Sequence, residues 1–202
     1  GNNSGKNLNA GNDVVLIGDS AGMNLVNPLN GGIIIGSGSL KSSADMHTSI
    51  VIGYNSAPNA TSCSSNVFIG SNLGANITTA ASCTVIGALA GTFLTSEQRS
   101  VIIGYQAGYQ GMKNGSDNVV IGYQAAGDTL SSSGIGQKNT IIGNLAGQQI
   151  AGAGTTDNCT LIGYNAMRGC GSDSNISIGY KSGRGDGCTG HNISIGQNAG
   201  GN

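Results

Sequence analysis

The stretch Ser100-Val101-Ile102-Ile103-Gly104-Tyr105-Gln106-Ala107-Gly108 (S-V-I-I-G-Y-Q-A-G) decides the fold, because variants of it recur along the whole chain. Each variant is centred on an Ile-Gly pair. The glycines of these pairs, here called the anchor glycines, are Gly18, Gly36, Gly53, Gly70, Gly87, Gly104, Gly122, Gly143, Gly163, Gly179 and Gly196. They span 178 residues in ten steps of 16 to 21 residues, an average of 17.8. Repetition at such a period is typical of folds in which short units stack on one another.

The residues around each anchor glycine predict a short strand followed by a tight turn. The residue three places before the glycine is β-branched in all eleven repeats, as strands prefer. Small residues and a second glycine commonly follow, as at Ala107 and Gly108. We therefore predict an all-β fold: a parallel β-helix, or β-solenoid, of about eleven coils. It forms a single domain over residues 1–202, with 1–12 as a degenerate N-terminal coil and 13–200 as the repeats.

Side chains alternate between the two faces of a strand, and this alternation predicts what lies inside. We expect the residues one and three places before the anchor glycine to face the interior. The residue one place before it is always isoleucine and is expected to form a core ladder: Ile17, Ile35, Ile52, Ile69, Ile86, Ile103, Ile121, Ile142, Ile162, Ile178 and Ile195.

The residue two places before the anchor glycine is then expected to point outward. It is apolar in nine coils, which predicts an interface stripe of Leu16, Ile34, Val51, Phe68, Val85, Ile102, Val120, Ile141 and Leu161. It is polar only at Ser177 and Ser194. A continuous outward apolar stripe favours burial against other copies of the chain, so we expect a homo-oligomer, with a trimer around the long axis preferred. A flattened solenoid whose own second sheet covers the stripe is the alternative.

Composition excludes several classes of partner. Charged residues are 8% of the chain and the net charge is -1, which is too little basic surface for a nucleic-acid partner. No stretch of eighteen apolar residues occurs, so membrane insertion is not expected. Because the chain begins at Gly1 within repeat-like sequence, we expect it to be a piece of a longer protein.

Cysteines and tyrosines are the candidate site residues. Cys170 and Cys188 lie nine and eight residues before their anchor glycines, which makes them disulfide candidates in adjacent coils. The alternative is that all five cysteines are buried and reduced. Tyrosines follow the anchor glycine in five coils and form a candidate contact ladder for a carbohydrate or protein, with cross-coil stacking as the structural alternative: Tyr54, Tyr105, Tyr123, Tyr164 and Tyr180.

Two further features concern the loops and the coil corners. Asparagines recur four places before the anchor glycine, for example Asn118 and Asn139, and are expected to form a hydrogen-bonded ladder. The widest spacings flank Gly143, so residues 123–162 are the expected contact region. The additional pair Ile135-Gly136 in this region is expected to lie within an expanded loop.

Three segments carry a resemblance to known repeats: N-V-V-I-G-Y-Q-A-A-G (Asn118 to Gly127), S-V-I-I-G-Y-Q-A-G and N-I-S-I-G-Q-N-A-G (Asn192 to Gly200). They resemble repeats of bacteriophage tail fibres and are similar to the head repeats of trimeric autotransporter adhesins. The resemblance implies a trimeric β-helical fibre that is extracellular or on a virion surface. The implied function is a structural fibre segment that gives rigid reach, with loops that attach to a host glycan or protein.

Two alternatives remain beside this interpretation. The first is a self-assembling extracellular filament subunit with no receptor. The second is an acyltransferase, because Ile103 to Gly108 also resembles the hexapeptide of left-handed β-helix acyltransferases, which use a histidine as general base. Only His47 and His191 are present, and neither lies in an acid/base pattern. We therefore expect no enzyme activity, no catalytic residue, no bound metal and no cofactor.

Overall fold

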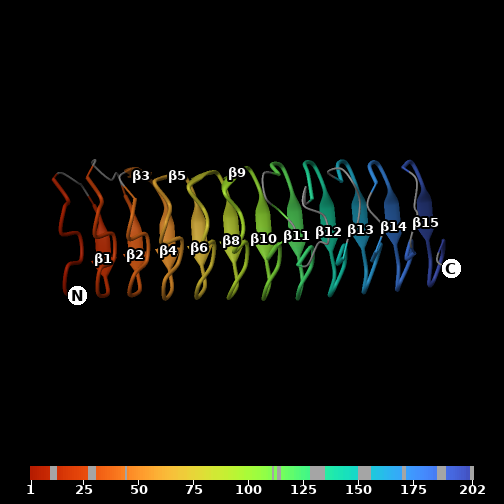
Figure 1. The fold of residues 1–202 in the computed structure, drawn as a ribbon, viewed down its shortest axis with the longest axis horizontal. Coiled ribbons are helices and arrows are strands. Elements are labelled where there is room, and N and C mark those ends of the chain that lie inside the picture. Colours follow the sequence, from red (N-terminus) through yellow and green to blue (C-terminus); the bar gives the residue numbers. More distant parts are fainter. Residues whose placement is uncertain are drawn as a thin grey trace.

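The computed structural model describes residues 1–9, 13–26, 31–43, 45–110, 112, 115–127, 135–149, 156–169, 172–185 and 190–200. Figure 1 shows an elongated stack of coils in which the chain advances steadily from one end to the other. The fold is an all-β parallel β-solenoid, which confirms the predicted fold class. The described part of the chain contains no helix long and apolar enough to cross a bilayer.

The main sheet has eleven parallel strands, each ending just before an anchor glycine. They are β1 (Val15–Ile17), β2 (Ile33–Ile35), β4 (Ile50–Ile52), β6 (Val67–Ile69), β8 (Thr84–Ile86), β10 (Val101–Ile103), β11 (Val119–Ile121), β12 (Thr140–Ile142), β13 (Thr160–Ile162), β14 (Ile176–Ile178) and β15 (Ile193–Ile195). Equivalent residues pair in register throughout, as Val101 pairs with Val119. Ten strand steps of about 4.8 Å make this sheet about 48 Å long.

A second parallel sheet occupies another side of four coils; a second sheet was predicted only as the alternative to oligomerisation, and its strands were not placed. Its strands are β3 (Asp45–His47), β5 (Ser62–Ser64), β7 (Thr79–Ala81) and β9 (Ser96–Gln98). Ile135, predicted to lie within an expanded loop, is outside the named strands, but its side chain is buried and its backbone forms a parallel bridge with Thr156. Parallel pairing with the next coil fixes these segments, although their own sequences carry little apolar periodicity.

The assignment of the two strand faces was wrong and is reversed in the structure. The residues two places before the anchor glycine, predicted to form an outward interface stripe, lie inside the solenoid. Leu16 is half-buried at the first coil, and the other eight are fully or almost fully buried: Ile34, Val51, Phe68, Val85, Ile102, Val120, Ile141 and Leu161. The isoleucines of the predicted core ladder, from Ile17 to Ile195, point outward instead and are half-buried or exposed.

The contents of the interior explain this reversal. The residues three places after the anchor glycine, such as Ala107, Ala125 and the larger Leu73, are fully buried and share this interior with the side chains two places before it. The polar exception also fits this interior, because the Ser177 hydroxyl lies 2.8 Å from both the carbonyl oxygen and the Oγ of Ser182. Alternation along the strand was predicted correctly, but which of the two faces is buried was not.

The anchor glycines are required by both conformation and close contact. Gly53 has a φ of 140°, a conformation that side chains of L-residues rarely adopt. A Cβ atom at this position would also overlap the carbonyl of Gly70 in the next coil. The same close approach recurs between successive anchor glycines, for example from Gly104 to Gly122. Because the coils touch backbone to backbone here, a glycine recurs at this place in every repeat.

A buried ladder of polar side chains joins the coils beside the main sheet. The Asn139 side chain accepts a hydrogen bond from the Cys159 amide at 2.8 Å and donates one to the Thr156 carbonyl at 2.8 Å. Its own amide donates to Asn118 Oδ1 at 2.9 Å. Each such side chain therefore satisfies backbone groups of the next coil that would otherwise be buried without partners.

Candidate functional surfaces

The outer side of the main sheet presents a continuous row of apolar side chains, here called the isoleucine face. It consists of the side chains one and three places before each anchor glycine in the eleven strands. The first set is isoleucine throughout, and the second is valine or isoleucine except at Thr84, Thr140 and Thr160. Exposure is greatest at the two ends of the stack, with 55% at Ile17, 71% at Ile193 and 64% at Ile195. Between the ends, neighbouring coils cover part of each side chain and leave its outer side in solvent.

The outer side of the second sheet has a different character. Its outward residues are polar or small: Asp45, His47, Ser62, Ser64, Thr79, Ala81, Ser96 and Gln98. Both sheets are parallel, and their strands are three residues long. Forming a short parallel strand in this fold therefore does not require apolar outward residues, and the apolar outer side of the main sheet needs another explanation.

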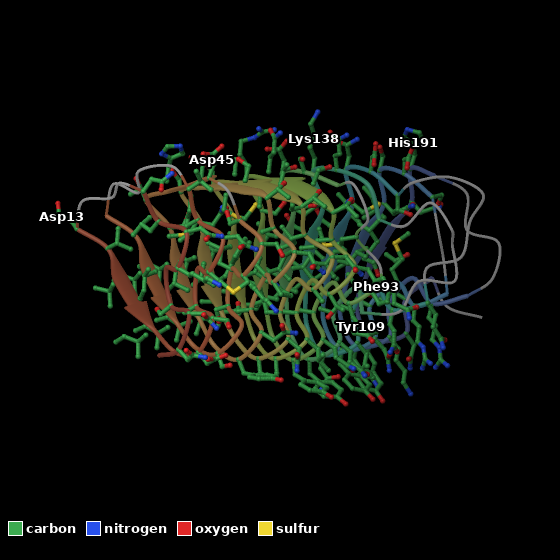
Figure 2. All side chains as sticks on the ribbon, turned by 60° about the vertical axis from the view of Figure 1, so that its left-hand side comes forward. Asp13, Asp45, Phe93, Tyr109, Lys138 and His191 are labelled. Atoms are coloured by element: carbon green, nitrogen blue, oxygen red, sulfur yellow. The ribbon has the colours of Figure 1, made fainter. Side chains whose placement is uncertain are left out.

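A polar row borders the isoleucine face at the corner that precedes each main strand. Arg99 forms a two-pronged ion pair with Asp117 in the next coil, at 2.6 and 2.9 Å. The hydrogen bonds from Arg99 lower the pKa of the Asp117 carboxyl, and the charges of Arg99 and Lys138 lower it further. Figure 2 shows Lys138 and His191 along the same long edge of the rod.

The tyrosine column borders the face at the opposite corner, just after the anchor glycines. The rings of Tyr105 and Tyr123 stack at 5.6 Å between centroids with an interplanar angle of 15°, and those of Tyr164 and Tyr180 at 5.4 Å and 11°. Asn144 separates the two pairs, since its coil carries no tyrosine at this place. Stacking covers one face of each of these four rings and leaves their edges exposed. The cross-coil stacking given above as the structural alternative is therefore present in both pairs.

Tyr54 differs from the other four members of the column. Its neighbours at the same place in adjacent coils are Ser37 and Ser71, so no ring stacks on it. It is 62% exposed, the highest value in the column. Of the predicted contact ladder, Tyr54 thus presents the largest uncovered aromatic surface to a partner.

The described cysteines are buried and free. Burial raises the pKa of Cys63 to about 12 and that of Cys83 to about 11, with nearby Cys83 and Glu97 adding to the respective shifts. Burial likewise raises the pKa of Cys159. Thiols held protonated in this way are poor nucleophiles and poor metal ligands at neutral pH. The predicted pair Cys170 and Cys188 lies outside the described residues.

Glu97 is a buried carboxyl that sequence reasoning missed. It continues an inward column of the second sheet formed by Met46, Cys63 and Ala80. Ser100 Oγ donates to Glu97 Oε1 at 2.7 Å, whereas Oε2 is buried without a hydrogen-bond partner. Desolvation raises the pKa of Glu97 to about 8, although the hydrogen bond from Ser100 acts in the opposite direction. No group of three or more His, Cys, Asp or Glu residues suited to a metal ion occurs in the described ranges.

No protein-family model, curated protein or solved structure matches this chain. The assignment of a function therefore rests on the coil stacking and on the surfaces described above.

Proposed function

We propose that this chain is a structural shaft segment of a fibre, of the kind found in virion tail fibres or surface adhesins. The observation that carries the proposal is the unbroken parallel pairing from β1 to β15, which makes a straight rod of eleven nearly equivalent coils. Such an architecture supplies reach and stiffness, since every coil is tied to the next by backbone hydrogen bonds. The extracellular or virion location belongs to the same proposal.

The shaft is proposed to attach to a host glycan or protein through its loops and corners. Tyr54 supports this part, because an exposed ring with an uncovered surface is suited to stacking on the apolar side of a sugar or on a protein side chain. Binding of the purified chain to an array of glycans tests the idea. We expect Tyr54→Ala to weaken any binding that is found and Phe93→Ala, on another corner, to leave it unchanged.

The shaft itself is tested by changing the number of coils. Residues 54–70 make one complete coil of 17 residues, so duplicating them should insert one strand step and leave the register intact. Three tandem duplications should lengthen the rod by about 14 Å, which small-angle X-ray scattering detects as an increase in the maximum dimension. A control insertion of residues 54–61, about half a coil, should disrupt folding. A maximum dimension that does not grow with the added coils would contradict the shaft.

A self-assembling filament subunit is the second candidate, and one observation favours it. β1 and β15 each pair on one side only within the described residues, so each presents a strand edge at an end of the rod. Exposed edges of this kind can pair with another chain. Electron micrographs of the chain alone distinguish the two candidates: rods of one fixed length favour the shaft, and long unbranched filaments favour the subunit.

A further inference from the structure

We infer that the isoleucine face is a contact surface between copies of this chain, with the face of one copy packed on the face of another. This inference replaces the predicted interface stripe, because Leu16 to Leu161 fill the interior and are not available to a partner. The inference rests on the proposed shaft and adds to it the surface through which copies assemble. The two share only one premise, which is the straight main sheet.

The chemistry of the face is the first argument. Its 22 positions hold eleven isoleucines in one ladder, and eight valines or isoleucines with three threonines in the other. None of them is charged, so two copies meet without repulsion and without burying an unpaired charge. An apolar side of a sheet is ordinarily covered in a folded protein. Here the inner side is covered by the solenoid, and the outer side is covered by nothing in the described chain.

The size of the face is the second argument. About 48 Å of length and about 10 Å of strand width correspond to about 500 Å² on each chain. Two copies would then bury about 1,000 Å² together, the lower limit of specific protein–protein interfaces. A single copy leaves this area in water, at the upper end of what monomeric proteins expose as one apolar patch.

The borders of the face are the third argument. The ion pair of Arg99 with Asp117 lies along one border and the tyrosine column along the other. An apolar centre with charged residues restricted to the rim, and with tyrosines enriched, is the usual anatomy of a protein interface. The second sheet lacks this arrangement, since its outward residues are polar or small across the whole width.

The flat and periodic surface favours a second copy as the occupant. The two ladders repeat at every coil, so the ridges of one copy match the grooves of an identical copy along the full length. Two copies related by a two-fold axis satisfy this requirement, and three copies around the fibre axis satisfy it as well. In the first arrangement the isoleucine face packs on itself, and in the second the three faces meet at the axis.

The mass of the chain in solution tests the inference. Light scattering coupled to size exclusion should give two or three times the 19.9 kDa of one chain. The variant Ile52→Lys with Ile142→Lys, on the isoleucine face, should reduce the mass to that of one chain and leave the circular dichroism spectrum unchanged. The matched control, Ser62→Lys with Ser96→Lys on the outer side of the second sheet, should keep the mass of the natural sequence.

A cross-linking measurement keeps the inference testable if the lysine variant does not fold. A photoreactive benzoylphenylalanine replacing Ile103 should give covalently linked chains on irradiation, and the same residue replacing Ser96 should give none. A mass of one chain for the natural sequence, or cross-links from Ser96 and none from Ile103, would overturn the inference. The same results would leave the shaft untouched, because its length is measured separately.

Discussion

Two neighbouring isoleucines, Ile102 and Ile103, allow the orientation of the strands to be tested by one substitution made at two positions. Both lie in β10 at the middle of the rod, and both would be shortened to alanine. Ile102 is completely buried, whereas Ile103 points outward and is covered only in part by its ladder neighbours. Residue type, strand and distance from the ends are therefore matched, and only the face differs.

The expected magnitudes differ clearly. Removing three carbons from a closed interior leaves a cavity as well as losing contacts, so Ile102→Ala should lower the free energy of unfolding by about 3 kcal/mol, within the range of about 2–5 for such changes. Ile103→Ala leaves no cavity, because water already reaches its outer side. It should cost about 1 kcal/mol or less in a single chain.

Urea unfolding followed by circular dichroism measures both values. The two substitutions are placed in the Ile52→Lys/Ile142→Lys variant, so that contacts with another copy do not contribute, and the neighbours of Ile103 in its ladder stay unchanged. Midpoints are compared alongside fitted free energies, because long repeat arrays can depart from two-state unfolding. If Ile103→Ala costs as much as Ile102→Ala, or more, the orientation described here is incorrect.

Three further predictions follow from interior contacts. The natural sequence should lose stability as pH rises from about 5 to 8, by at most about 1.4 kcal/mol per pH unit. The reason is that the folded Glu97 carboxyl, with a pKa of about 8 against an ordinary 4.5, holds a proton that the unfolded chain releases. Glu97→Gln should abolish this pH dependence in denaturant titrations made at each pH. Gly104→Ala should lower the unfolding midpoint far more than Gly185→Ala, because both glycines have positive φ but only the first meets the backbone of the next coil; equal effects would show that close approach is unimportant. Asn139→Ala should cost about 2–4 kcal/mol in the same assay, since it leaves the Cys159 amide and the Thr156 carbonyl buried without partners, whereas exposed Asn144→Ala should cost almost nothing.

Much of the architecture could be predicted because the coils repeat. The same structural requirement, such as the backbone contact between successive anchor glycines, recurs from coil to coil. Glycine therefore recurs at one place in all eleven repeats, and this recurrence can be recognised in the sequence. The second sheet could not be predicted in this way. Strands such as β9, with Ser96 to Gln98, are held by pairing with the preceding coil, and their own side chains do not mark them as strands.

The candidate surfaces were predicted only in part. The five tyrosines were recognised from their constant place after the anchor glycine, and the structure adds that four of them stack in pairs. Glu97 was missed because nothing in its own sequence distinguishes it from an exposed glutamate. Its burial follows from the direction of the second sheet, which places it in one column with Cys63 and Ala80.

The repeat pattern alone establishes the fold class, the number of main strands, their boundaries and the alternation of two sets of side chains. The tertiary structure decided which set is inside. Alternation places Ile102 and Ile103 on opposite faces of the strand but does not say which face is buried. Both sets of residues are apolar, so hydrophobicity does not distinguish the inner face from the outer one. The choice depends on how each coil closes. The turn after the anchor glycine carries Ala107 into the same interior as Ile102, and both side chains are completely buried there.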